Sequence, residues 1–148
     1  MHRRAAAVLV AACCLMAAGC AGSSRTDDDY RRKAANTAEA AASALGTARV
    51  ATSAAGRGNA TSAYLSVVLG EAEKDLEGAE QAFTSRQPPS EKADRVRDEV
   101  SEALTDAADA LAAARIAARR GDASAWGSHT GELTRAKQRL EQLEERLS

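Results

Sequence analysis

The sequence predicts an all-α fold, an antiparallel up-down-up-down four-helix bundle, and three observations lead to this class. Residues that favour helices dominate the chain, and Ala alone supplies 37 of the 148 residues. The two prolines, Pro88 and Pro89, are adjacent, so proline interrupts the helical pattern at one place only. Three short breaks divide residues 28–147 into segments of similar length. Short connections between helices of matching length favour antiparallel neighbours.

The first helix is expected over about residues 28–55. Thr26 is a candidate N-cap, and Asp29 completes a capping box with it. The segment Gly56-Arg57-Gly58-Asn59 ends this helix, because Gly favours a left-handed C-cap and Asn suits the N-cap of the next helix. Apolar residues spaced alternately by three and four lie on one face of a helix. They are Tyr30, Ala34, Ala38, Ala41, Leu45 and Ala48.

The second and third helices are expected over about residues 60–85 and 91–120. The segment Gln87-Pro88-Pro89-Ser90 separates them, because proline cannot continue a helix and restricts the residue before it. Each helix again has an apolar stripe. The second stripe is Leu65, Val68, Ala72, Leu76, Ala79 and Phe83, and the third is Val96, Val100, Ala103, Ala107, Leu111 and Ala114, with Leu104 beside it.

The fourth helix is expected over about residues 123–147, after a stop at Gly121 and a cap at Asp122. Its stripe has two interpretations. The leucines pack inside the bundle, or they form a coiled-coil contact with a second copy or a partner. The stripe comprises Trp126, His129, Leu133, Ala136, Leu140, Leu143 and Leu147.

The first twenty residues have the composition of an export signal. Arg3 and Arg4 give a positive start, and Ala5 to Ala18 form an uncharged run of 14 residues. A bilayer-spanning helix needs about 20 apolar residues, whereas a run of this length suits the apolar region of a signal peptide. We therefore exclude this segment from the predicted fold.

The residues Ala17-Ala18-Gly19-Cys20 resemble the lipobox of bacterial lipoproteins, in which small residues precede a cysteine. The resemblance implies that Cys20 receives a diacylglyceryl group and that a dedicated peptidase cuts between Gly19 and Cys20. Ala17 departs from the family pattern, which most often has Leu at that position. Two alternatives stay open: ordinary secretion with cleavage near Ala18, and an uncleaved N-terminal anchor.

The expected organisation is a signal peptide over residues 1–19, a lipidated cysteine with a polar tether over 20–29, and a helical bundle over 30–148. Cys13, Cys14 and Cys20 are the chain's three cysteines, so cleavage leaves no pair for a disulfide. The mature chain has 18 basic and 21 acidic side chains, a formal charge of −3. This weak, mixed charge argues against nucleic acid as a partner. The excess of Arg over Lys, 16 to 4, is reminiscent of actinobacterial proteins.

No residue pattern indicates catalysis or a cofactor, so we expect no enzyme and no metal. The mature chain has one histidine, His129, and no acid stands three residues before it, as a di-iron bundle would require. We interpret His129 as a residue of the helix seam. Gly127 and Gly131 have the spacing of close helix packing. The tripeptide Arg120-Gly121-Asp122 is interpreted as a helix end followed by a cap. The acidic residues of the second helix are expected to form a solvated face: Glu71, Glu73, Asp75, Glu77 and Glu80.

The expected function is that of a lipoprotein of the cell envelope with a non-catalytic bundle that binds or scaffolds another envelope component. Cys20 would anchor it to the extracytoplasmic face of the cell membrane, or to the outer membrane if the cell has two membranes. The partner is a protein of the envelope or a second copy of the chain. The alternative is a carrier or sensor of a small ligand, with a pocket between helices lined by Tyr64, Phe83 or Trp126.

Overall fold

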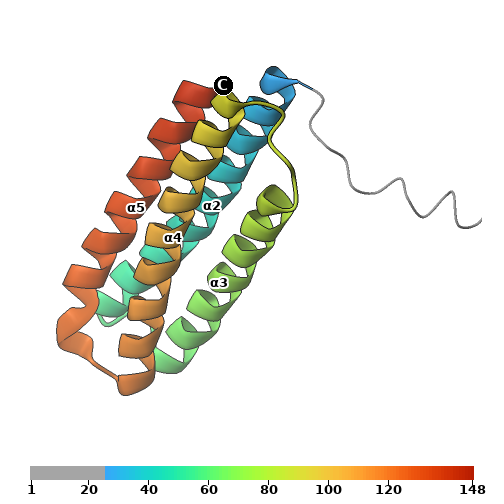
Figure 1. Ribbon diagram of the computed structural model, residues 1–148. Helices are drawn as coiled ribbons and strands as arrows, with labels where there is room; N and C mark the ends of the chain where they lie inside the picture. The colour runs from blue at the N-terminus through green and yellow to red at the C-terminus, as the bar shows by residue number, and fades with distance from the viewer. Residues whose placement is uncertain (1–25) are drawn as a thin grey trace, which may run out of the picture.

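The computed structural model describes residues 26–148, which form four long helices (Figure 1). The predicted all-α four-helix bundle is confirmed, and the helix bounds agree with the expected ones to within two residues, apart from the start of the fourth helix. That helix is preceded by a single 3₁₀ turn, Ala123–Ala125. The helices are α2 (Asp27–Gly56), α3 (Ser62–Thr84), α4 (Glu91–Arg120) and α5 (Trp126–Leu147).

Contacts between α2 and α5 follow an antiparallel register. At one end, the guanidinium of Arg31 donates to the backbone oxygen of Leu147 over 3.5 Å. Further along, a Cβ placed on Gly46 would lie 3.5 Å from Cε of Lys137. The colours of Figure 1 reverse direction from each helix to the next in the same way. The start of α2 and the end of α5 therefore lie at one end of the bundle.

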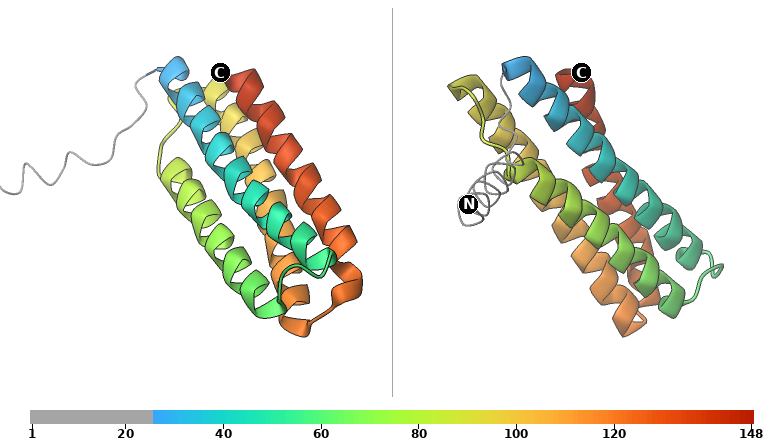
Figure 2. Two further views of the ribbon diagram at one scale, coloured as in Figure 1. Left: turned by 180° about the vertical axis from the view of Figure 1, so that it is seen from behind. Right: turned by 90° about the vertical axis from the view of Figure 1, so that its right-hand side faces the viewer.

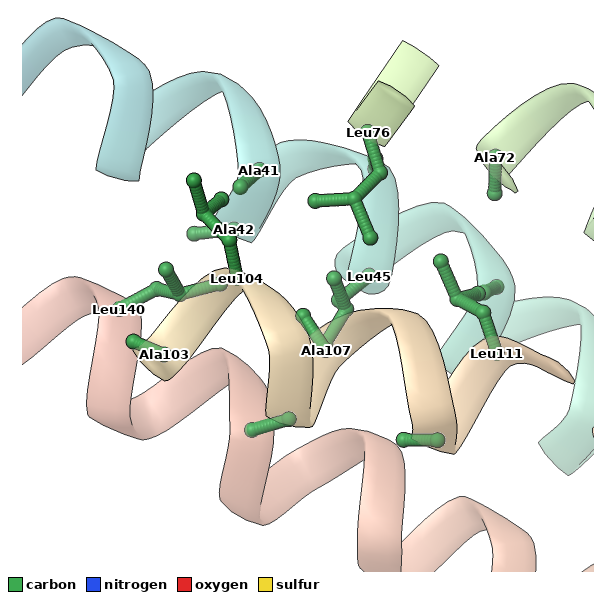
Figure 3. Close-up of a cluster of buried hydrophobic side chains, with 14 of the residues drawn as sticks. Ala41, Ala42, Leu45, Ala72, Leu76, Ala103, Leu104, Ala107, Leu111 and Leu140 are labelled. Carbon is green, nitrogen blue, oxygen red and sulfur yellow. The ribbon is translucent and has the colours of Figure 1, made fainter. Parts of the chain in front are cut away.

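Helices α2 and α4 each contact the other three long helices, and the contacts of α2 with α5 and α3 are the most extensive in the bundle. Figure 2, in its left view, shows α2 in front, between α3 and α5. Alanine side chains on two of its faces allow neighbouring backbones to approach closely, and Figure 3 shows such alanines among leucines from the other helices. The buried residues of α2 are Tyr30, Ala34, Ala35, Ala38, Ala41, Ala42, Ala44, Leu45, Ala48, Ala51 and Thr52.

The predicted apolar stripes coincide with most of the core. Every stripe residue of α2 is buried, and the leucines of α5 are all buried inside the bundle, so core packing accounts for that stripe. In α3, Val68 and Ala79 are only half-buried, and Leu69 occupies a core position that the stripe did not include. His129 in α5 and Val96 in α4 are also half-buried.

Side-chain caps begin three of the helices. Thr26 caps α2 as predicted, since its Oγ1 accepts from the backbone N–H of Asp29 over 3.1 Å. Thr61 caps α3 and Ser90 caps α4 in the same way. The expected cap at Asn59 was wrong, because two more residues follow it before the helix begins.

Two further expectations at helix ends need correction. The left-handed residue after α2 is Gly58, with φ 75°, and Gly56 is the last helical residue. The tether was expected to extend to residue 29, but Asp27, Asp28 and Asp29 form the first turn of α2. Three carboxylates at a helix N-terminus interact favourably with the helix dipole, which explains why the helix begins so early.

We expect Gly121→Ala to lower the free energy of unfolding by about 1–2 kcal/mol, because Gly121 ends α4 with φ 65° and a Cβ is strained in that conformation. Gly78→Ala is the matched control: Gly78 lies exposed inside α3 with open space around it. This control should stabilise by about 0.5–1 kcal/mol. Urea unfolding followed by circular dichroism compares the two variants. Equal effects would contradict the left-handed conformation assigned to Gly121.

Candidate functional site

An open groove of about 1150 Å³ runs along the face of α2 between α3 and α5. Its floor is α2, one wall is the second half of α5, and the other is the start of α3 with the loop before it. The lining residues are Glu39, Ala42, Ser43, Gly46, Thr47, Arg49, Val50, Ala51, Ala54, Asn59, Ala60, Thr61, Tyr64, Val68, Lys137, Glu141 and Glu144.

The floor and the edge of the groove have different characters. Small residues of α2, among them Ala42, Gly46 and Ala54, make up much of the floor. Two large apolar side chains on the groove, Val50 and Tyr64, are each 58% exposed. The other large apolar side chains that are exposed in the described chain, Val67 and Ile116, do not line the groove. A partner on this face would bury Val50 and Tyr64 together.

Charges divide the groove into two ends. Gly46 lies beside Lys137, and α2 and α5 are antiparallel, so Glu39 on α2 and Glu144 on α5 lie at the same end. Glu141 lies one turn from Glu144 and is paired with Lys137. Within residues 26–148, neither Glu39 nor Glu144 has an ion-pair partner. The opposite end has no carboxylate among its lining residues and contains Arg49.

The α2 residues of this groove were not among those predicted from the sequence. A signal was present, since Val50 lies two residues beyond the last stripe residue, Ala48, and off the stripe itself. A bulky apolar residue off the stripe of a helix is exposed unless another element covers it. The groove depends on how far α3 and α5 stand apart over α2, which no local pattern encodes.

The three residues expected around a ligand pocket do not meet. Tyr64 lies on the groove. Phe83 is buried near the start of α2, with its ring centroid 5.5 Å from that of Tyr30. Trp126 is buried at the other end of α2, where its Cβ lies 3.5 Å from the Cβ position of Gly56. Tyr30 and Gly56 are 26 residues apart on one helix, or about 39 Å.

His129 lies at the start of α5, where its Nδ1 is 3.1 Å from Oε2 of Glu132 one turn later. In residues 26–148, no group of three or more His, Cys, Asp or Glu side chains is arranged to hold a metal ion. In the tripeptide Arg120-Gly121-Asp122, Gly121 ends α4 in a left-handed conformation as expected, but the expected cap was wrong, because Asp122 makes no side-chain cap hydrogen bond and Ala125 precedes α5. Asp122 accepts a hydrogen bond of 2.6 Å from Ser124, which holds the pKa of that carboxyl below its ordinary value.

The acidic residues of α3 belong to the surface of the bundle. Glu71 pairs with Lys74 one turn later, and Glu73 pairs with Arg115 of α4 at 2.6 Å. Asp75 and Glu77 are exposed, and Glu80 is half-buried. This distribution matches a solvated face with one link to a neighbouring helix, as the spacing predicts.

The predicted lipidation and cleavage residues, Cys20 and Gly19, lie outside the described residues. The first described residue, Thr26, follows Cys20 by six positions and caps α2. None of the helices in residues 26–148 combines the length and the apolar character that crossing a bilayer requires.

Comparisons with protein-family models, with curated proteins and with solved structures found no match to this chain. The lipobox resemblance and the groove are therefore the features of this chain that bear on its function.

Proposed function

We propose that this protein is a lipid-anchored protein of the cell envelope whose helical bundle binds another envelope protein along the α2 groove, without catalysing a reaction. The observation that carries the proposal is the open groove itself. Its floor is made of small residues, and Val50 and Tyr64 stand exposed beside it.

The anchor rests on the sequence Ala17-Ala18-Gly19-Cys20 and on the charged, then apolar, residues before it. One acyl chain holds a protein at a membrane only marginally, whereas the two chains of a diacylglyceryl group make a stable attachment. From Cys20 to Asp27 the chain reaches at most about 25 Å when extended. The start of α2 and the end of α5 would then face the membrane.

A protein partner fits the groove better than a small ligand does. Pockets for small ligands enclose most of the ligand's surface, whereas this groove is open to solvent along α2. Two of the aromatic residues that could line an enclosed pocket, Phe83 and Trp126, are packed into the core instead. A carrier of a small ligand is therefore the weaker candidate.

We expect Cys20→Ser to abolish lipid labelling and processing, because the acyl group is attached to this thiol and cleavage follows attachment. The measurement is metabolic labelling with an alkyne fatty acid, together with fractionation and the mass of the product. Cys14→Ser is the control, since it alters a neighbouring thiol that the proposal leaves unmodified. A Cys20→Ser protein of mature size in the membrane fraction would contradict the anchor.

The binding role is tested with a photo-crosslinking amino acid placed at position 50 in cells that express the full chain. We expect a protein-sized adduct from position 50, because Val50 lies on the groove. Gln138, exposed on α5 and outside the groove lining, is the control position. Absence of an adduct at position 50, or equal adducts from both positions, would contradict the proposal.

A further inference from the structure

We propose that the partner segment that occupies the α2 groove is an amphipathic helix with basic residues at one end, and that these lie over Glu39, Glu141 and Glu144. The inference rests on the proposed function and adds the chemical class of the partner. It follows from the shape of the groove and from its charges.

The shape of the groove suits a helix. It lies along α2 between two other helices, so it resembles the position of one more helix in a bundle. From Glu39 to Ala54 the floor covers 15 residue steps, about 23 Å, which matches a helix of about 15 residues. Small residues such as Ala42 and Gly46 allow a neighbouring helix axis to approach closely, to about 8 Å. Val50 and Tyr64 would then contact the apolar face of that helix.

The charges specify one end of the helix. Three carboxylates, Glu39, Glu141 and Glu144, lie at the end of the groove nearest the start of α2, against the single ammonium of Lys137. The net negative charge there attracts Lys or Arg at the corresponding end of the partner helix. The other end contains Arg49 and repels basic residues, so the groove discriminates between the two ends of an occupant.

A second copy of this chain is disfavoured as the occupant. In a two-fold dimer the same surface meets itself. Two copies anchored through Cys20 in one membrane would have their α2 helices parallel, so Glu39 would face Glu39 and Arg49 would face Arg49. Like charges in register weaken such a contact. An antiparallel pairing would match the charges, but it would place one anchor at the far end of the bundle.

The test uses the full processed chain in nanodiscs of zwitterionic lipid and two fluorescent peptides of about 15 residues. Both have leucines at helical spacing on one face, and one has two arginines at an end where the other has two glutamates. We expect the arginine peptide to bind roughly fivefold to tenfold more tightly at low salt, from two exposed charge pairs. Anisotropy measures both affinities, and added salt should reduce the difference.

Two variants test whether the peptides bind in the α2 groove. Glu39→Lys with Glu144→Lys should invert the preference between the peptides, since both residues lie at the acidic end. Val50→Ser should weaken the binding of both peptides by about tenfold, because the apolar contact made by the exposed Val50 side chain is lost.

The proposal is overturned if neither peptide binds, if the double variant leaves the preference unchanged, or if sedimentation shows that the anchored chain is a stable dimer. If neither peptide binds while position 50 still gives a protein adduct, the proposal of a basic amphipathic helix is wrong and the proposed binding of an envelope protein stands.

Discussion

Leu104→Ala is expected to lower the free energy of unfolding by about 2–5 kcal/mol. Leu104 is fully buried in α4, within a cluster to which all four long helices contribute (Figure 3). Its loss removes apolar surface and leaves a cavity, which the alanines around it are too short to fill. Since small domains are stable by only about 5–15 kcal/mol, this one change removes a large share of the total.

Ile116→Ala is the matched control on the same helix, because Ile116 is 44% exposed and outside the core cluster. Its effect should be about 1 kcal/mol or less. Urea unfolding measures both effects. If the free energy of unfolding falls with urea concentration at the same slope in the variant and the wild type, the substitution has changed stability and not the unfolded state. Equal effects of the two substitutions would show that the core does not close around Leu104.

Tyr30→Phe is expected to raise the free energy of unfolding by about 1–3 kcal/mol at neutral pH. The ring of Tyr30 packs against that of Phe83, and the buried Tyr30 hydroxyl has no hydrogen-bond partner among the described residues. Burying an unpartnered hydroxyl destabilises the folded state, while the ring of phenylalanine fills the same space. Thermal and urea unfolding measure the gain, and a loss of stability would show that the hydroxyl has a partner in solution.

The advantage of Tyr30→Phe should grow in alkali. Burial raises the pKa of the Tyr30 phenol and is the largest effect on it. The charge of Arg97 lowers this pKa, whereas the charges of Asp94 and Asp98 raise it. The unfolded phenol ionises near pH 10, while the folded one still holds its proton. Ionisation of this phenol then favours the unfolded state, so the wild type loses stability as the pH rises past about 10. The Phe variant has no phenol at this position and lacks this particular loss. Tyr64→Phe is the control, since Tyr64 is exposed.

The helices could be predicted because their signals are local. Caps such as Thr26 and breaks such as Pro88 and Pro89 act within a few residues, so they mark helix ends without reference to the rest of the molecule. The apolar stripes identified the core face for the same reason. Leu69 was missed because α3 is apolar over more than one face at its start, where Leu65, Val67, Val68 and Leu69 are close together.

The candidate site was less accessible from the sequence. Ala40 is exposed and Ala41 is buried, although both are alanines of α2. Alanine is small and only weakly hydrophobic, so its pattern does not distinguish a face that is covered from one that is open. The expected pocket combined aromatic residues that share a chemical type, yet Phe83 and Trp126 pack near opposite ends of α2.

The sequence by itself determined the four helices, their approximate bounds, the apolar stripe of α5 and the expectation of a lipid anchor at Cys20. The tertiary structure decided which side of α2 stays open, which charges gather there, and that Tyr64 and Val50 border the groove while Phe83 and Trp126 do not. The reason is that helix formation depends on neighbours a few residues apart, whereas a groove depends on how separate helices pack against one another.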